Sequence, residues 1–254
     1  MTLRTLAAAV LAAILVIAIA AAAWTGLRRA GGPEFQPFAS YPGFRILASG
    51  SGGASGAGAA LIGLGEDDRP AAPSPAELCG LIWSAPGVPA QGPADAHDRV
   101  AVFSDANCPW CRRLDEIVVE LAQDRPDLRL VHHEWAVLGE GSRLAARATL
   151  AANEQGAAEP MRRRLLAARF VITPAYVAQL AVSLGLDPDR LARDMASRRV
   201  DAALAATHRA AGALGFAGTP VVVVGGTVAV GAVSRADLDR LLALEAERPD
   251  APCR

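Results

Sequence analysis

Hydrophobic and polar positions follow a regular pattern from residue 99 onward, and this pattern predicts an α/β fold. Residues 99–104 form a short apolar run that is suited to a buried strand. After a turn at residues 105–107, apolar side chains recur every three or four positions, which is the spacing of an amphipathic helix. A second strand is expected at residues 128–131. The remaining expected elements are helices at residues 142–155, 157–170, 174–184, 188–197 and 200–214, strands at residues 219–224 and 227–230, and a last helix from Ser234 to about residue 247.

Residues 30–98 show little of this regularity. They are rich in Gly, Pro, Ser and Ala, a composition typical of linkers. Apolar pieces at residues 44–48 and 60–64 could pair as short strands, and residues 77–84 could form a short helix. The Gly-rich run at residues 50–58 is not followed by the lysine that a Walker-type phosphate loop requires. We therefore interpret this region as a linker with a small added element.

The N-terminal residues 1–29 are expected to be a signal peptide or a membrane anchor. Residues 6–23 form an unbroken apolar run with arginines on both flanks. Such a run is about long enough to span a bilayer as a helix, and Ala21-Ala22-Ala23 also offers a signal-peptide cleavage site. Trp24 stands where an interfacial aromatic residue would anchor a membrane span. In either case the rest of the chain is predicted to lie outside the cytoplasm.

The composition excludes several classes of protein. The chain has 254 residues, with 25 basic and 26 acidic side chains and a net charge of −1, so it lacks the basic field of a general nucleic-acid binder. None of the basic residues is lysine, which excludes Walker-type phosphate binding and Schiff-base catalysis. Four cysteines are too few for a small disulfide-stapled scaffold. We expect no cofactor and no metal.

The candidate chemistry lies at Cys108 and Cys111. They stand at positions i and i+3 where the expected helix begins, with Pro109 and Trp110 between them. The free N–H groups and the positive dipole end of a helix N-terminus stabilise a thiolate and lower its pKa. Pro109 is tolerated because the first helical positions need no N–H donor. In thiol–disulfide exchange, Cys108 would be the outer, attacking thiolate and Cys111 the inner thiol that resolves the mixed disulfide.

Other uses of this pair stay open at this point. A structural zinc site would need a second cysteine pair or added histidines, whereas Cys79 and Cys253 are isolated and His132-His133 are adjacent. Haem attachment requires a histidine after the second cysteine, and residue 112 is Arg. Copper binding and a purely structural disulfide are the remaining alternatives. Exchange is favoured because a strand precedes the pair and an amphipathic helix follows it.

Three motifs mark the second part of the chain: FSDANCPWCRRL at residues 103–114, GSRLAARATLAA at residues 141–152 and GFAGTPVVVVGG at residues 215–226. In combination they resemble the DsbA-like branch of the thioredoxin superfamily. The resemblance covers residues 99–248 and implies a thioredoxin-like fold that a helical domain interrupts, here at about residues 140–214. Residues 249–254 would be a short C-terminal tail, and residues 30–98 lie outside the resemblance.

The same resemblance assigns roles at the site. It implies that Cys108 is the nucleophile and Cys111 the resolving thiol. It also implies that Pro220 is a cis proline packed against the pair, and that Thr219 offers backbone groups to an extended substrate. From its position alone, Pro220 is equally compatible with a trans peptide at the start of a strand.

Two positions depart from the family pattern. Val102 stands where many relatives carry a buried acid, so another group or water must serve Cys111 in proton transfer. Asp105 is close in sequence, but an aspartate in a turn is expected to be a cap. Trp110 stands where many periplasmic oxidases carry histidine. Without that positive neighbour a Cys108 thiolate is less stabilised, so we hypothesise a milder oxidant than the strongest members of the family.

The other singled-out residues have structural interpretations. In an oxidising compartment Cys79 and Cys253 could form a disulfide that ties the tail to the N-terminal extension. Free thiols, an intermolecular bridge and lipid attachment are the alternatives. His132-His133 is interpreted as the end of a strand, and the run Arg162-Arg163-Arg164 as a solvated helix face.

Together these observations predict an extracytoplasmic protein disulfide oxidoreductase. It would be periplasmic and either released or held at the inner membrane through Leu6 to Leu27. Its partners would be reduced or misoxidised secreted polypeptides and, by analogy with the family, a membrane redox partner, with no nucleic acid. The alternatives are a reductase or isomerase that receives electrons from a membrane donor, and a copper-handling module that binds metal through Cys108 and Cys111.

Overall fold

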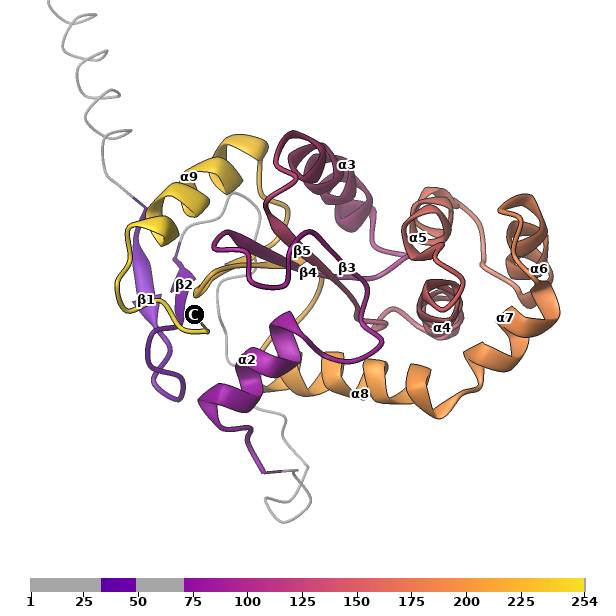
Figure 1. The fold of residues 1–254 in the computed structure, drawn as a ribbon, viewed down its shortest axis with the longest axis horizontal. Helices are drawn as coiled ribbons and strands as arrows, with labels where there is room; N and C mark the ends of the chain where they lie inside the picture. Colours follow the sequence, from indigo (N-terminus) through magenta and orange to yellow (C-terminus); the bar gives the residue numbers. More distant parts are fainter. Residues whose placement is uncertain (1–32, 49–70, 254) are drawn as a thin grey trace, which may run out of the picture. The chain divides into compact units, whose positions relative to one another are not determined.

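The computed structural model describes residues 33–48 and 71–253, and every element named here belongs to the unit that begins at Phe35. In chain order these elements are β1 (Phe35–Pro37), β2 (Arg45–Leu47), α2 (Pro75–Trp83), β3 (Ala90–Gln91), β4 (Arg99–Ser104), α3 (Pro109–Asp124), β5 (Arg129–Glu134), α4 (Glu140–Asn153), α5 (Ala158–Ala167), α6 (Pro174–Ser183), α7 (Pro188–Met195), α8 (Arg198–Ala213), β6 (Val221–Val224), β7 (Thr227–Val230) and α9 (Arg235–Ala246) (Figure 1). The apolar segment at residues 6–27 and the piece at residues 60–64 lie outside the described residues. No helix in the described part of the chain is long and apolar enough to cross a membrane.

A mixed sheet with the strand order β1-β2-β7-β6-β4-β5-β3 organises the described residues. β4 lies inside it, parallel to β5 and antiparallel to β6. All four valines of β6 are buried, as expected for a strand that is covered on both faces. Gly225-Gly226 joins β6 to β7 in the predicted hairpin. Gly226 also lets the C-terminal tail approach, because a Cβ atom there would collide with Pro252.

Helices cover both faces of this sheet (Figure 1). On β4, Val100 and Val102 belong to the core beneath α3 and α9, whereas Ala101 and Phe103 belong to the core beneath α2 and α8. This division follows from the two-residue period of a strand, which sends successive side chains to opposite faces. The apolar run at residues 99–104 is therefore continuous because both of its faces are buried.

The expected helical block is present as α4 to α8. Thr173 and Asp187 cap the N-termini of α6 and α7 with their side chains, which is why these starts can be read from the sequence. Ser197, the last residue of the helix expected at 188–197, instead caps α8, which begins two residues before its expected start. α5 ends three residues before its expected end. The chain becomes extended at Ala168, whose carbonyl accepts a hydrogen bond from Arg112 of α3 at 3.0 Å. The loop that follows α5 is thereby held beside α3.

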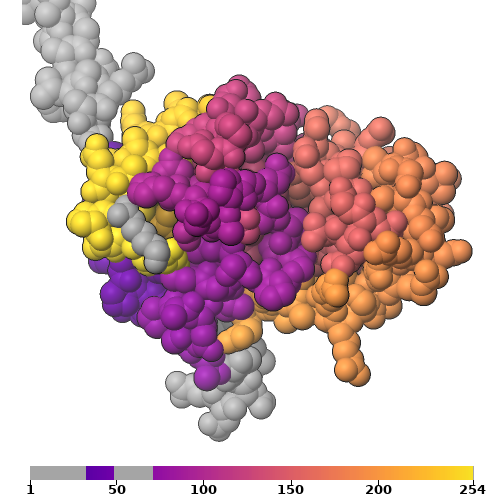
Figure 2. Space-filling model, in the orientation of Figure 1, coloured from indigo at the N-terminus to yellow at the C-terminus, as the bar shows by residue number. Residues whose placement is uncertain are grey.

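The described residues before β4 belong to the same sheet and core. Residues 45–47 form a strand within the apolar piece expected at residues 44–48. Their partners in the described sheet are β1 and β7. α2 forms at the expected helix, and its Leu78 and Ile82 are fully buried. In the space-filling view the purple residues that follow residue 71 lie between the yellow C-terminal residues and the orange helices (Figure 2). This region therefore supplies edge strands and part of the core.

Candidate active site

Cys108 caps the N-terminus of α3, directly after β4 and one turn. Its backbone is extended, and its Sγ accepts a hydrogen bond from the N–H of Cys111 at 3.3 Å. The turn is closed by the N–H of Cys108, which donates to the carbonyl of Asp105 at 3.0 Å. Pro109 and Trp110 occupy the first helical positions, where no N–H donor is needed. The sulfur of Cys108 therefore lies at the positive end of the α3 dipole.

The two thiols have opposite pKa shifts. The pKa of Cys108 falls from 9.0 to about 6, chiefly because the side chain of Cys111 donates a hydrogen bond to it, with further donors at Thr219 and in the backbone of Cys111 and Trp110. The pKa of Cys111 is raised, because its proton is held in that hydrogen bond and because the thiol is buried. At neutral pH the reduced pair is therefore a Cys108 thiolate beside a Cys111 thiol.

Thr219 and Pro220 reach the pair from the start of β6. Their peptide bond is cis, as the resemblance implies. The carbonyl oxygen of Thr219 lies 3.5 Å from the Sγ of Cys108. The sequence places these residues more than 100 positions from Cys108, and the antiparallel pairing of β6 with β4 brings them together.

Asp105 is a buried cap that ties the cysteine turn to the loop before α4. Its Oδ1 accepts hydrogen bonds from the N–H of Asn107 at 2.8 Å and from the hydroxyl of Ser142 at 2.6 Å. Its Oδ2 accepts from the N–H groups of Val137 and Leu138, at 2.8 and 2.9 Å. The expectation that this aspartate is a cap is confirmed. Ser142 is a supporting residue that the sequence did not indicate.

The buried acid of this region comes from the neighbouring strand. Val102 is buried in an apolar core, as its residue type requires. Glu134, at the end of β5, lies opposite Ser104 of β4 in the parallel pairing. Burial, with a contribution from the charge of Asp105, raises the pKa of Glu134 to about 8. Its Oε1 has no hydrogen-bond partner among the described residues. Sequence reasoning missed this residue, whose only signal was an acid at the end of an apolar strand.

Arg162 corrects the interpretation of residues 162–164 as a solvated face. Its side chain is buried and forms an ion pair with Asp115 of α3. Asp115 stands one helical turn after Cys111, so this pair lies on the face of α3 that carries the resolving cysteine. The exposed Arg163 fits the original interpretation. Arg162 departs from it because α5 packs against α3.

The two adjacent histidines are structural, as expected from their place on a strand. His133 forms hydrogen-bond contacts of 3.0 Å with the hydroxyl of Thr207 and 2.9 Å with the carbonyl of Ile82. Its ring stacks on Phe103, with 4.2 Å between centroids. Burial lowers the pKa of both His132 and His133 to about 4, so both are neutral at physiological pH.

Two open hollows border the cysteine pair. The proline-side hollow is lined by Trp110, Arg113, Ile117, Thr219, Pro220 and residues 231–235. The loop-side hollow is lined by Asn107, Arg112, Leu138, Gly141 and residues 168–172. Trp110 of the dipeptide is 61% exposed. A polypeptide therefore has room to lie on the surface beside Cys108.

The second cysteine pair lies at the other end of β4. Cys79 of α2 and Cys253 of the tail form a disulfide with 5.2 Å between their Cα atoms. This is the pairing hypothesised from the sequence. Arg99, the first residue of β4, donates to the carbonyl of Cys253 at 2.8 Å. Because Cys108 follows the last residue of β4, the two pairs are separated by about the length of that strand.

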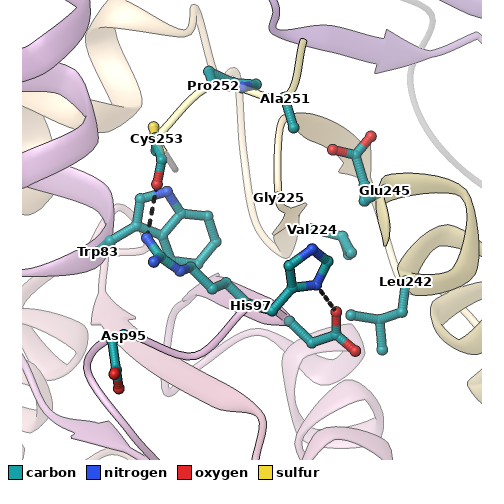
Figure 3. Close-up of a pocket in the computed structure, with 12 residues that line it drawn as sticks. Trp83, Asp95, His97, Val224, Gly225, Leu242, Glu245, Ala251, Pro252 and Cys253 are labelled. Atoms are coloured by element: carbon teal, nitrogen blue, oxygen red, sulfur yellow. Dashed lines mark hydrogen bonds and ion pairs between the residues drawn. The ribbon is translucent and has the colours of Figure 1, made fainter. Parts of the chain in front are cut away.

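A cavity of about 230 Å³ lies beside this disulfide (Figure 3). Trp83 and Cys253 lie on one side of it, and Leu242 and Glu245 on the other. None of its lining residues lines either hollow beside Cys108.

Within residues 33–48 and 71–253, no group of three or more His, Cys, Asp or Glu side chains is placed to hold a metal ion.

Comparisons with known proteins agree with this geometry. Residues 99–243 match the model of the DSBA-like thioredoxin domain family. A thioredoxin-like oxidoreductase from Silicibacter pomeroyi DSS-3 superposes with a TM-score of 0.63 at 36% identity, over 66% of this chain and 98% of that chain. The thiol-disulfide exchange protein alpha-DsbA2 from Wolbachia pipientis shares the fold with a TM-score of 0.61 at 17% identity, over 67% and 94% of the two chains. A periplasmic thioredoxin-like protein from Salmonella enterica serovar Typhimurium does so with a TM-score of 0.60 at 22% identity, over 67% and 97%.

Two curated relatives are much longer proteins. They are Na(+)/H(+) antiporter NhaA 3 of Salinispora tropica and Na(+)/H(+) antiporter NhaA 1 of Salinispora arenicola, which are 34% and 33% identical to this chain over 138 residues. The matched region is 54% of this chain and 21% of each antiporter. The likeness therefore concerns about a fifth of those proteins.

Proposed function

Because the chain belongs to the DSBA-like thioredoxin domain family, we propose that it is a protein disulfide oxidoreductase that acts through Cys108 and Cys111. The observation that carries the proposal is the setting of the Cys108 sulfur. It lies 3.3 Å from the N–H of Cys111 and 3.5 Å from the carbonyl of Thr219, beside two open hollows. The N–H donor of Cys111 supports a stabilised thiolate at Cys108, and the hollows support a surface where an extended polypeptide can lie.

The oxidising cycle begins with a disulfide between Cys108 and Cys111. A substrate thiolate attacks the Sγ of Cys108, a new S–S bond forms, and Cys111 leaves as a thiolate that takes up a proton. A second substrate thiolate then attacks the substrate sulfur of this mixed disulfide and releases Cys108 as a thiolate. The substrate has lost two electrons and two protons. The protein has gained the two electrons and holds one proton on Cys111, and the other proton passes to solvent.

The pKa difference within the pair supports this direction. A Cys108 pKa of about 6 makes Cys108 the better leaving group of the two and stabilises the reduced form of the protein at neutral pH. A reduced form that is stabilised in this way makes the disulfide an oxidant. Trp110, in place of a positive residue, supplies no further charge, so we infer an oxidant milder than the strongest family members.

We place this reaction outside the cytoplasm. The disulfide of Cys79 with Cys253 is of a kind that persists in oxidising compartments, and the apolar segment from Leu6 to Leu27 has the composition of a signal or an anchor. The substrates would be reduced or misoxidised cysteines of secreted polypeptides in the periplasm. A membrane redox partner would return the Cys108–Cys111 pair to the disulfide form.

The reduction potential of the pair, measured against glutathione buffers, tests the proposal. We expect a value above about −270 mV, the potential of thioredoxin, and below about −120 mV, the potential of a strong oxidant. With a peptide that carries a disulfide, the Cys108 thiolate of Cys111→Ser should attack that disulfide, release one peptide thiolate and accumulate as a mixed disulfide, and Cys108→Ser should accumulate none. A potential near that of thioredoxin would instead support a reductase that receives electrons from a membrane donor. A pair that does not cycle would contradict the proposal.

A further inference from the structure

Three arginines border the nucleophile and have no ion-pair partner among the described residues. Arg112 and Arg113 follow Cys111 directly on α3, and Arg169 lies in the loop after α5. Arg112 donates from its Nε and one Nη to the carbonyls of Leu166 and Ala168, and these neutral acceptors leave its charge uncompensated. Arg113 and Arg169 are exposed. All three side chains line the hollows beside Cys108.

Within residues 33–48 and 71–253, no acidic side chain lines either hollow. The lining residues there include arginines but no Asp or Glu. The acids closest in sequence are used elsewhere. Asp105 is buried and accepts hydrogen bonds from four groups, Asp115 pairs with Arg162, and Glu140 pairs with Arg143. Glu116 stands one turn further along α3 and lines neither hollow. The N-terminal end of α3 adds its own positive dipole, so the surface around Cys108 carries an uncompensated positive field.

The same surface exposes large apolar side chains. Trp110 is 61% exposed in the proline-side hollow, and Leu138, Phe170 and Val171 are 51%, 57% and 78% exposed in the loop-side hollow. Exposed apolar groups on both sides of a reactive sulfur indicate a surface that another molecule covers. Its complement must bring apolar side chains and negative charge to the same place.

Building on the oxidoreductase function proposed above, we propose that this surface selects its substrates by charge. The preferred substrate is an extended polypeptide segment in which acidic side chains flank the cysteine and apolar side chains lie further out. The flanking acids face Arg112, Arg113 and Arg169, and the apolar residues cover Trp110 and Phe170. An acidic neighbour also raises the pKa of the substrate thiol, and the arginines offset this effect when the substrate thiolate approaches Cys108.

The test compares two peptides that carry the same two cysteines and differ only in having Glu or Lys beside each cysteine. The rate at which the oxidised full chain oxidises each peptide is measured with the parent and with the double variant Arg113→Gln/Arg169→Gln. For each peptide, the rate with the variant is divided by the rate with the parent. The intrinsic reactivity of the peptide's thiols cancels in this ratio, and the ratios of the two peptides are then compared. Arg112 is left unchanged because it also binds two backbone carbonyls. The matched control is Arg198→Gln, which removes an exposed arginine of α8 that also has no ion pair among the described residues and lines neither hollow.

We expect the double variant to oxidise the Glu peptide about tenfold more slowly, or about threefold for each charge removed near the surface. Oxidation of the Lys peptide should stay equal or become faster. Arg198→Gln should change neither rate by more than about twofold, and the tenfold effect should vanish near 1 M salt, where the screening length is about 3 Å.

Equal ratios for the two peptides would overturn the inference and leave the oxidoreductase function standing, whereas a parent that oxidises neither peptide would overturn that function itself. An anionic membrane is the other complement of a positive, apolar surface. The same proteins are therefore tested for binding to phosphatidylglycerol vesicles. Vesicle binding that the double variant loses, with unchanged peptide ratios, would assign this surface to lipid and also overturn the inference.

Discussion

The two cysteine pairs lie at opposite ends of β4 and differ in the features that control thiol chemistry. Cys108 and Cys111 are three residues apart, and the first of them caps a helix whose N–H groups point at its sulfur. Cys79 and Cys253 are 174 residues apart and already joined, one within a helix and the other in the tail. The first pair can open and close with only a helical turn between its members. The second closes a loop of most of the chain.

Placement, more than residue type, therefore separates a reactive pair from a structural one. A sulfur at a helix N-terminus gains stability as a thiolate, which makes its disulfide easier to reduce. A cysteine within α2 has no such free donors, because the N–H groups there are used in the helix. Each prediction below changes one side of this contrast and leaves the other intact.

The largest effect on stability should come from the tail disulfide. The double variant Cys79→Ser/Cys253→Ser removes the cross-link between α2 and the tail, and we expect a loss of about 3–5 kcal/mol in the free energy of unfolding because the closed loop is long. Urea unfolding of the oxidised parent and variant measures this loss. The rate of exchange through Cys108 should stay within about twofold of the parent rate.

A folded double variant that has lost exchange activity would show that the second pair takes part in the catalytic cycle. Unfolding that is unchanged would show that the noncovalent contacts of the tail suffice. Those contacts are the bond from Arg99 to the carbonyl of Cys253 and the packing of Pro252 on Gly226.

The reactive pair was predictable because its signals are local. Strand β4, the start of α3 and the spacing of Cys108 and Cys111 all lie within 13 residues. The caps Thr173 and Asp187 likewise bond to N–H groups two or three positions ahead, so a short window contains both partners.

The misses concern groups whose partners are distant in sequence. Arg162 looks like its exposed neighbour Arg163 until α3 brings Asp115 to it. Glu134 ends an apolar strand, and only the pairing of β5 with β4 buries it. The short strands β1 and β3 have three and two residues, too few for a two-residue alternation to show. The tail disulfide could be hypothesised only because two cysteines were left over.

The second prediction removes the donor that lowers the pKa of Cys108. In the reduced parent, the ultraviolet absorbance of the Cys108 thiolate should titrate with a midpoint near pH 6. In Cys111→Ala the midpoint should rise toward 9, because the largest stabilising hydrogen bond is gone, whereas Cys111→Ser keeps a hydroxyl donor and should lie between the two. The pKa of Cys108 is lower in the folded protein than in the unfolded chain. The stabilisation of the reduced fold is therefore complete above about pH 9 and is lost as the pH falls through 6. Equal midpoints in the alanine and serine variants would contradict this assignment.

The smallest effect should come from the residue between the cysteines. Trp110→His introduces an imidazole beside the Cys108 thiolate, and this imidazole is positive when protonated. A fall of one unit in the Cys108 pKa stabilises the reduced protein at neutral pH by about 1.4 kcal/mol. Since 30 mV corresponds to about the same free energy for a two-electron couple, we expect the reduction potential to become about 30 mV more oxidising at neutral pH. The thiolate raises the pKa of the imidazole in the reduced form. The gain should therefore be present between the Cys108 pKa and that imidazole pKa, and it should fade as the pH rises above this window or falls below it. Trp110→Gln is the matched control, because it removes the exposed indole without adding charge. If both variants shift the potential equally, the indole itself sets the potential, and the absence of a positive residue is not what makes this protein a mild oxidant.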